Sequence, residues 1–354
     1  MKFKVLALAA VVGIMGVECM AQKKAPPGKA KKVAQWDARL VQVKSSADGT
    51  MQPCWYWAPE KAKVTAVPLI VGLHTWSGDY KQLGHYQTVQ REAKKRGWAF
   101  VGPNFRGANS TPQGCGSELA VQDIEDAVEY AKKECMVDAD RVYIIGGSGG
   151  GHMTLLMLGR RPGLFAGGSA FCPITDLARW HADSLLKHPG RGKHYAKMME
   201  KACGGTPSER AEEYAKRSPL TWLKDAKAPA YIATGIHDGW TGSVPVGHSL
   251  RGFNALCKEG GAISEAHIAA IEAKRSIPEG LVSEKVDDPF YSAKQRIHFR
   301  RTSGNVRVTL FEGGHSGNFR AGFDFLSRQR RGSPVDWGLP ENAQASGGIE
   351  ALSH

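Results

Sequence analysis

Short, uninterrupted apolar segments recur along the chain and alternate with longer segments that have helical periodicity. Continuous apolar runs predict strands that are buried on both faces, as in a parallel sheet covered by helices. The clearest predicted helix spans residues 117–135, where Val121, Ile124, Val128 and Ala131 form one apolar stripe. We therefore predict an α/β fold with a mostly parallel central sheet flanked by helices. The strands expected in its parallel part are residues 67–73, 99–102, 142–145, 168–171, 230–233 and 306–311.

Other segments depart from this pattern. Residues 39–43 and 51–57 flank an Asp48-Gly49 turn signal, which predicts an antiparallel pair at one edge of the sheet. Residues 306–311 alternate apolar and polar side chains, so we expect this last strand to lie at the other edge. Two long insertions, residues 174–218 and 262–304, follow the sixth and seventh predicted strands. Such insertions at strand ends commonly build a substrate pocket.

The glycine-dense segment after the strand at 142–145 contains Gly146-x-Ser148-x-Gly150 and is followed by a helical run. This is the pattern of a nucleophile elbow, a strained strand-to-helix turn that exposes a serine hydroxyl. The positions two residues before and after the serine must be nearly free of side chain, so that strand and helix can pass each other. A dinucleotide-binding loop would need a different glycine spacing and an acidic residue about 20 positions on. We therefore predict Ser148 as a nucleophile.

A serine nucleophile needs a histidine base and an acid, which follow it in that fold in the order serine, acid, histidine. Asp238 lies just after the strand at 230–233, and His315 follows the last strand after two glycines. We expect His315 to take the proton from Ser148 and Asp238 to orient the imidazole. Asp176, after the preceding strand, is the main rival acid.

Two N–H groups should stabilise the oxyanion of the intermediate. One is predicted from Gly149, directly after the nucleophile. The second should come from the loop after residues 67–73, where the backbone of either Thr75 or Trp76 could supply it. We expect His74 to brace this loop instead of acting as a base.

The N-terminal segment has the features of a secretory signal peptide. A basic start precedes an apolar run, residues 5–17, that is too short to span a membrane comfortably, and Cys19-Met-Ala21 offers a cleavage site after Ala21. Lipidation at Cys19 is the alternative, although Glu18 fits it poorly. We therefore expect a secreted or periplasmic protein with a signal peptide at 1–21, a disordered basic leader at 22–34, a catalytic domain at 35–333 and an irregular tail at 334–354.

Six cysteines remain after cleavage at Ala21, which permits disulfides in an exported protein without fixing their pairing. There is no C-x-x-C pair, so we expect no structural zinc site. The formal net charge of +13 is spread along the chain without an aromatic-interleaved RNA motif. We therefore expect no nucleic-acid partner, no membrane association after cleavage, no cofactor and no metal. The oligomeric state stays open.

Taken in order, these motifs are similar to the catalytic domain of prolyl-oligopeptidase-type α/β-hydrolases over roughly residues 64–330. The resemblance implies an α/β-hydrolase fold and a Ser-His-Asp triad. Two features depart from it: only short strands precede residue 67, so no large propeller is expected, and the loop at His74-Thr-Trp lacks the family's oxyanion tyrosine. The matching stretches are Leu73-His-Thr-Trp, Val121-Gln-Asp-Ile-Glu-Asp-Ala-Val, Asp138-Ala-Asp-Arg-Val, Gly146-Gly-Ser-Gly-Gly-Gly, Ser218-Pro-Leu, the Asp238 loop and Gly313-Gly-His315.

These departures favour a secreted serine esterase that resembles carbohydrate esterases and acts on a small-molecule or polysaccharide ester. The alternatives are a serine peptidase of the prolyl-oligopeptidase type and a non-catalytic glycan-binding protein; an intact triad argues against the latter. Trp180, Tyr195 and Trp240 are the side chains predicted to bind substrate, because aromatic rings stack on sugars and two of them lie in the first long insertion.

Overall fold

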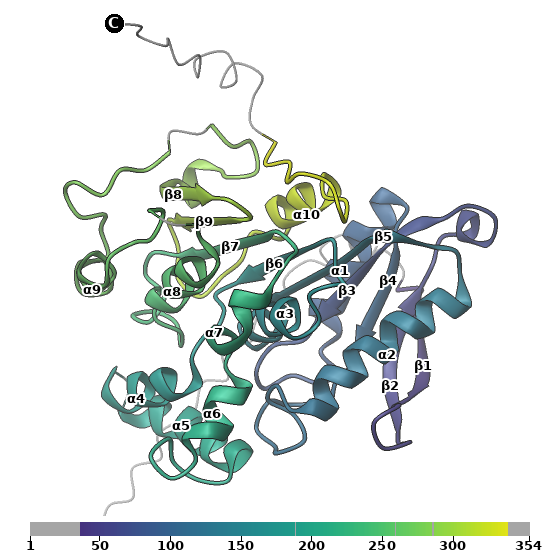
Figure 1. Cartoon of the computed structure of the whole chain (residues 1–354), viewed down its shortest axis with the longest axis horizontal. Helices are drawn as coiled ribbons and strands as arrows, with labels where there is room; N and C mark the ends of the chain where they lie inside the picture. Colours follow the sequence, from purple (N-terminus) through teal and green to yellow (C-terminus); the bar gives the residue numbers. More distant parts are fainter. Residues whose placement is uncertain (1–35, 188, 259, 285–286, 339–354) are drawn as a thin grey trace, which may run out of the picture. The chain divides into compact units, whose positions relative to one another are not determined.

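The computed structural model describes residues 36–187, 189–258, 260–284 and 287–338, which are built around one nine-stranded sheet (Figure 1). Its order is β1-β2-β4-β3-β5-β6-β7-β9-β8. The six strands from β4 to β9 in this order are parallel to one another, whereas β1, β2 and β8 are antiparallel to their neighbours. The strands are β1 (Arg39–Lys44), β2 (Met51–Trp57), β3 (Val67–Leu73), β4 (Ala99–Pro103), β5 (Val137–Gly147), β6 (Gly167–Phe171), β7 (Ala230–Gly235), β8 (Ile297–Ser303) and β9 (Val306–Phe311).

The antiparallel pair predicted at one edge of the sheet is confirmed, whereas the prediction that residues 306–311 form the other edge is wrong. β1 and β2 form the expected antiparallel pair, closed by hydrogen bonds between Ser45 and Thr50 and between Gly49 and Ser45. β9 is not an edge strand, because β8 pairs with it on its outer side. The polar side chains of β9 are satisfied inside the protein: Arg300 of β8 donates to Thr309 Oγ1 at 3.0 Å, and Arg307 is 7% exposed.

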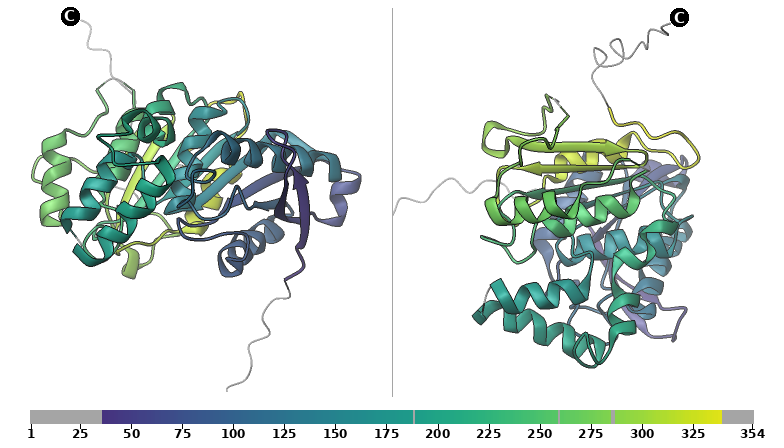
Figure 2. Two further views of the ribbon diagram at one scale, coloured as in Figure 1. Left: turned by 90° about the horizontal axis from the view of Figure 1, so that it is seen from below. Right: turned by 60° about the vertical axis from the view of Figure 1, so that its left-hand side comes forward.

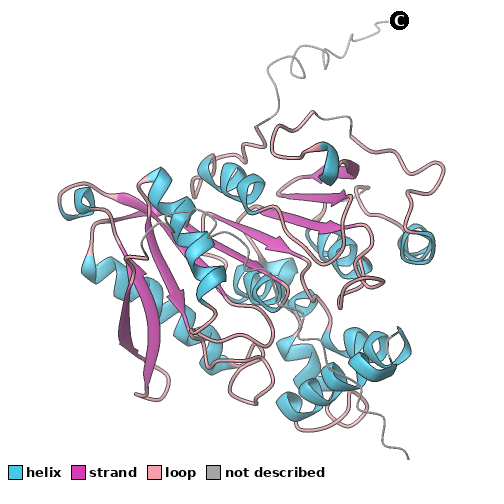
Figure 3. Ribbon diagram, turned by 180° about the vertical axis from the view of Figure 1, so that it is seen from behind, coloured by secondary structure: helices cyan, strands magenta, loops and turns pink. Residues whose placement is uncertain are grey.

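Helices cover both faces of the sheet (Figures 2 and 3). On one face, α2, α3 and α8 contribute Ile124, Leu156 and Leu250 to a large buried cluster with alternate residues of the strands. On the other face, α1 and α10 pack on the sheet, and Trp98 lies against Tyr143 and Phe323. The helices are α1 (Leu83–Arg96), α2 (Glu118–Glu134), α3 (Gly149–Arg160), α4 (Leu177–Lys187), α5 (Pro189–Cys203), α6 (Ala211–Arg217), α7 (Pro219–Trp222), α8 (Gly247–Leu256), α9 (Glu265–Lys274) and α10 (Phe319–Ser327), with short 3-10 turns η1 (Glu60–Lys63), η2 (Leu223–Asp225) and η3 (Ala293–Gln295).

The predicted helix at 117–135 is α2, and Ser117 caps it by accepting a hydrogen bond from the Ala120 N–H at 3.1 Å. The two insertions also lie where the sequence placed them. Residues between β6 and β7 form α4 to α7, and residues between β7 and β9 form α8, α9 and β8. The mostly parallel sheet with flanking helices is therefore confirmed.

α4, α5 and α6 gather at one end of the molecule, in teal and green in Figure 1. Trp180 of α4 contacts two loops at the carboxyl edge of the parallel strands. Its ring centroid lies 4.7 Å from that of Trp76 in the loop after β3, and its Nε1–H donates to Ser243 O in the loop after β7 at 2.7 Å. The insertion therefore lies on the side of the sheet where the predicted catalytic residues lie.

Several expectations concern the ends of the chain and its cysteines. The predicted signal peptide and basic leader lie outside the described residues, as does the tail beyond residue 338. Within the described tail, Trp337 stacks on Phe325 with ring centroids 5.0 Å apart.

The six cysteines between residues 54 and 257 are free thiols. None of the helices in the described part is long and apolar enough to cross a membrane.

Candidate active site

Ser148 lies in a strained turn between β5 and α3. Its φ of 57° and ψ of −120° are unusual for a residue with a side chain. The turn is held by a hydrogen bond from the Ser148 N–H to Phe171 O at 2.8 Å. Strand and helix cross closely, since a Cβ on Gly146 would lie 2.4 Å from the Gly150 carbonyl carbon. The backbone has the form expected of a nucleophile elbow, and the serine is partly exposed.

His315 and Asp238 meet because β7 and β9 are neighbouring parallel strands, so the loops after them leave the same edge of the sheet. His315 Nδ1 lies 2.8 Å from Asp238 Oδ2. The Asp238 side chain is fully buried, and its Oδ1 accepts from the N–H groups of Gly239 at 2.9 Å and Val244 at 3.3 Å. This carboxylate is therefore fixed by the backbone and aimed at the imidazole.

The environment of His315 favours its protonated form. Burial lowers the pKa of His315, but the hydrogen bonds with Asp238 and Cys172 outweigh burial and raise the pKa well above its ordinary value. With Nδ1 committed to Asp238, Nε2 is the ring nitrogen that remains for proton exchange.

The rival acid, Asp176, has a different role in the structure. Its Oδ1 accepts a hydrogen bond from the Arg179 N–H at 3.0 Å, which caps the first turn of α4. Of the two candidate acids, Asp238 is the one that is hydrogen-bonded to His315.

The structure also distinguishes the two candidate oxyanion donors. The Thr75 N–H donates to Gln82 Oε1 at 2.9 Å, and Gln82 Nε2 donates to Thr75 Oγ1 at 2.8 Å. The Trp76 N–H has no acceptor within the described part of the chain. The Trp76 backbone also lies beside Gly149, where an added Cβ would be 2.4 Å from Trp76 N. The geometry thus favours the N–H groups of Gly149 and Trp76 over that of Thr75.

His74 braces this loop, as expected. Its Nε2 lies 2.9 Å from Asn104 O and its Nδ1 lies 2.9 Å from Thr75 O, while the ring stacks on Phe105 at 3.8 Å. Burial lowers the pKa of His74, which suits a structural imidazole.

Two residues near the candidate triad, Cys172 and Glu312, were not predicted as site residues from the sequence. Cys172 directly follows β6, the strand between those that carry Ser148 and Asp238, and its thiol lies within 4.8 Å of donor atoms of Asp238 and His315. Glu312 precedes the His315 loop and binds His237 Nε2 and His298 Nε2, each at 2.7 Å. The position of Cys172 after a buried strand was a usable signal; the pairing of Glu312 with two histidines arises only in the fold.

The predicted substrate-binding aromatic residues occupy different environments. The prediction for Trp180 is wrong, because its ring is 1% exposed and packs among Trp76, Tyr195 and other core residues. Tyr195 is partly buried against the Trp180 ring. Trp240 is 50% exposed, near Asp238 in sequence, and the Arg275 guanidinium lies 4.1 Å from the centre of its ring. Trp240 is the member of this group with a ring open to solvent.

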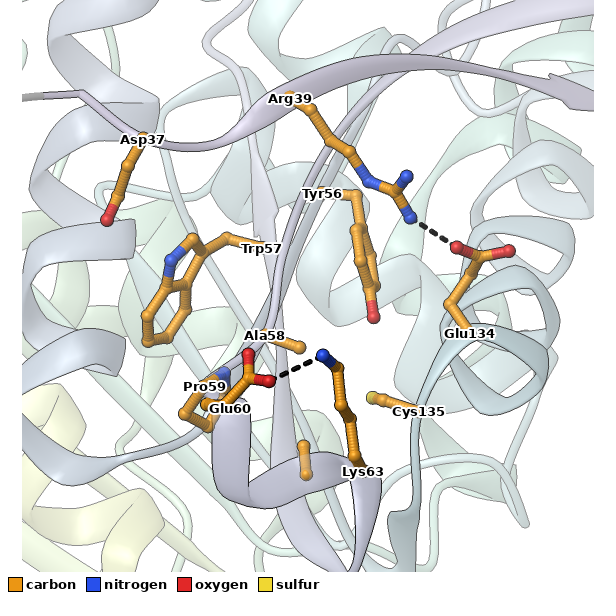
Figure 4. Close-up of a pocket in the computed structure, with 11 residues that line it drawn as sticks. Asp37, Arg39, Tyr56, Trp57, Ala58, Pro59, Glu60, Lys63, Glu134 and Cys135 are labelled. Carbon is orange, nitrogen blue, oxygen red and sulfur yellow. Dashed lines mark hydrogen bonds and ion pairs between the residues drawn. The ribbon is translucent and has the colours of Figure 1, made fainter.

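A pocket of about 380 Å³ lies at the edge of the sheet opposite the candidate active site (Figure 4). Trp57 at the end of β2, Lys63 of η1 and Cys135 before β5 line it, so it opens at the amino edge of the parallel strands. Four of its charged groups pair with each other, Arg39 with Glu134 and Lys63 with Glu60. It is therefore separate from the candidate active site.

The model of the prolyl oligopeptidase family matches residues 88–273. Dipeptidyl aminopeptidase BIII of Pseudoxanthomonas mexicana is 30% identical over 183 residues, which cover 49% of this chain and 25% of that protein. Acylamino-acid-releasing enzyme 1 of Oryza sativa subsp. japonica is 24% identical over 214 residues, or 58% of this chain and 26% of that protein. The chain thus spans about a quarter of the length of these curated relatives.

Solved structures are similar as well. The uncomplexed acylaminoacyl peptidase of Pyrococcus horikoshii has a TM-score of 0.58 at 20% identity, over 88% of this chain and 44% of that one. An acylaminoacyl peptidase in complex with Z-Gly-Gly-Phe-chloromethyl ketone has a TM-score of 0.50 at 25% identity, over 62% of this chain and 35% of that one. These similarities confirm the expected α/β-hydrolase fold.

Proposed function

Because this chain belongs to the prolyl oligopeptidase family of serine hydrolases, we propose that it is a serine peptidase that uses Ser148, His315 and Asp238. The observation that carries the proposal is the bond between His315 Nδ1 and Asp238 Oδ2 at 2.8 Å, at the sheet edge where Ser148 lies in its strained elbow. The relatives described above are named as a dipeptidyl aminopeptidase and an acylamino-acid-releasing enzyme, which supports the peptidase alternative over the esterase that the sequence favoured.

In this proposal, Ser148 Oγ attacks the carbonyl carbon of the substrate while its proton passes to His315 Nε2. Asp238 holds the Nδ1 proton and stabilises the imidazolium that forms. The carbonyl oxygen becomes an oxyanion, which accepts hydrogen bonds from the N–H groups of Gly149 and Trp76. These donors are rigid, because Gln82 holds the Thr75 backbone and α3 fixes Gly149.

The intermediate collapses when His315 gives its proton to the leaving amine, and the acyl group stays on Ser148. Water then attacks this ester with His315 as base, which releases the acid and restores the serine. The same groups would hydrolyse an ester, so the triad alone does not select the substrate. The difference lies in the leaving group, since an amine must be protonated before it departs.

The discriminating experiment compares matched substrates that share one acyl group and differ only in an amide or an ester bond. We expect cleavage of acylated and free N-terminal peptide amides as well as the esters, with both activities lost in Ser148→Ala. Activity confined to acetylated xylan, feruloylated sugars or other esters would contradict the peptidase proposal. Binding of glycans without any hydrolysis would contradict catalysis altogether.

We further propose that the protein is exported to the periplasm or beyond the cell, with cleavage near Ala21. The support is the sequence pattern of residues 1–21. N-terminal sequencing of protein recovered from each cellular fraction tests it: a mature chain beginning at Gln22 is expected, and an uncleaved cytoplasmic chain would contradict it.

A further inference from the structure

Cys172 links the elbow strand to the histidine loop. It follows Phe171, whose carbonyl oxygen accepts from the Ser148 N–H at 2.8 Å. Its Sγ lies 3.0 Å from Ser316 O, to which the thiol donates, and 3.4 Å from Thr234 Oγ1. Its φ of 46° is in the left-handed region, which is unusual for a residue with a side chain. The proposed peptide chemistry gives this buried thiol no task.

Three different ligand types meet at this point. Donor atoms of Cys172, Asp238 and His315 all lie within 4.8 Å of one another. Thiolate, imidazole and carboxylate are the side-chain ligands that zinc binds, at about 2.0–2.3 Å, which places ligand atoms roughly 3.3–3.7 Å apart in a tetrahedral site. Small side-chain rotations would therefore suffice to bring the three donors onto one ion, with a fourth position left for water.

We propose that this cluster is an inhibitory site for Zn²⁺, formed by Cys172 Sγ, His315 Nδ1 and the Asp238 carboxylate. The thiol loses its proton to solvent when it binds the ion. The ion occupies His315 Nδ1, so the bound imidazole is neutral and carries its one ring proton on Nε2; an imidazolium that binds the ion also releases its Nδ1 proton to solvent. Nε2 can then no longer accept the proton of Ser148. The Asp238 carboxylate binds the ion and no longer accepts the hydrogen bond from His315 Nδ1.

The inhibition rests on the proposed function, whereas binding of the ion does not. Ser148→Ala removes catalysis but leaves all three ligands in place, so its Zn²⁺ affinity reports the site alone.

The test is a titration of the full chain with Zn²⁺ in competition with a chromophoric chelator, together with hydrolysis assays in the same buffer. The informative variants are Cys172→Ser and Cys172→Ala; the serine keeps a donor for Ser316 O but is a far weaker zinc ligand. Cys257→Ser is the matched control, a thiol at the end of α8 outside the cluster. Glu312→Gln removes the other carboxylate that binds histidines.

We expect wild type, Ser148→Ala, Cys257→Ser and Glu312→Gln to bind one Zn²⁺ alike. Both Cys172 variants should bind it at least about tenfold more weakly. Inhibition of hydrolysis should be reversed by chelator and lost in both Cys172 variants, whose fold is checked by labelling of Ser148 with a fluorophosphonate. Unchanged affinity in the Cys172 variants, or loss of binding in Glu312→Gln alone, would overturn the proposal. Zinc binding without any hydrolysis by wild type would instead refute the proposed function and leave the site standing.

Discussion

At the scale of single residues, the sequence predicted those side chains whose roles depend on local backbone. Ser148 needs glycines on both sides to form its turn, and the glycine pattern is visible in the sequence. The choice between the Thr75 and Trp76 N–H groups is not visible there, because it depends on the hydrogen bond that the Thr75 N–H donates to Gln82 Oε1 at the start of α1. Cys172 reaches His315 only through the pairing of β6 and β7.

The first prediction at this scale concerns the acid. Asp238→Asn should lower kcat by about 10⁴, because the amide no longer fixes the imidazole tautomer or stabilises the imidazolium. Asp176→Asn should change kcat little, since Asp176 only caps α4. Steady-state kinetics on one peptide amide compares the two matched substitutions. A larger loss in the Asp176 variant would place the acid after β6.

The second concerns pH. His315 must be neutral to accept a proton, so kcat/KM should rise as the pH increases through the pKa of His315. Because that pKa is raised by Asp238, the midpoint of the acidic limb should lie above the ordinary histidine value of about 6.5. The pH profile of kcat/KM measures it. A midpoint at or below pH ~6.5 would show that Asp238 does not stabilise the protonated imidazole.

At the scale of elements, continuous apolar runs predicted the buried parallel strands, and a turn signal predicted the β1–β2 pair. β8 was missed because His298, Arg300 and Arg301 give it the composition of a basic loop. Two of these side chains form ion pairs outside the strand, Arg300 with Asp288 and His298 with Glu312. For the same reason the polar positions of β9 falsely indicated an edge.

A third prediction follows from the corrected position of Trp180. Trp180→Ala should lower the free energy of unfolding by about 3–5 kcal/mol, because it empties a buried site between two loops. Amide and ester hydrolysis should then fall together as the Trp76 loop loses its support. Urea denaturation measures the stability. Trp240→Ala is the control: its ring is half-exposed, so stability should change by only about 1 kcal/mol. A stable Trp180 variant with a raised KM would instead show that this ring faces substrate.

At the scale of the whole molecule, the described residues between Asp37 and Gly338 form one compact unit that carries every candidate catalytic residue. The fold class was predictable because alternating strands and helices admit few arrangements. The substrate class was not, since triad and oxyanion groups are the same for esters and amides. The family match and the names of the relatives are what support the proposal of an amide substrate.

The most direct test of the central claim, that Ser148 is an activated nucleophile, is covalent capture. The full chain is treated with a fluorophosphonate, digested, and the modified peptide is identified by mass spectrometry. We predict one adduct per chain, on Ser148, that is absent in Ser148→Ala and forms far more slowly in His315→Gln, because the hydroxyl is weakly nucleophilic without its base. No adduct, an adduct on another residue, or equal labelling of the His315 variant would contradict the account.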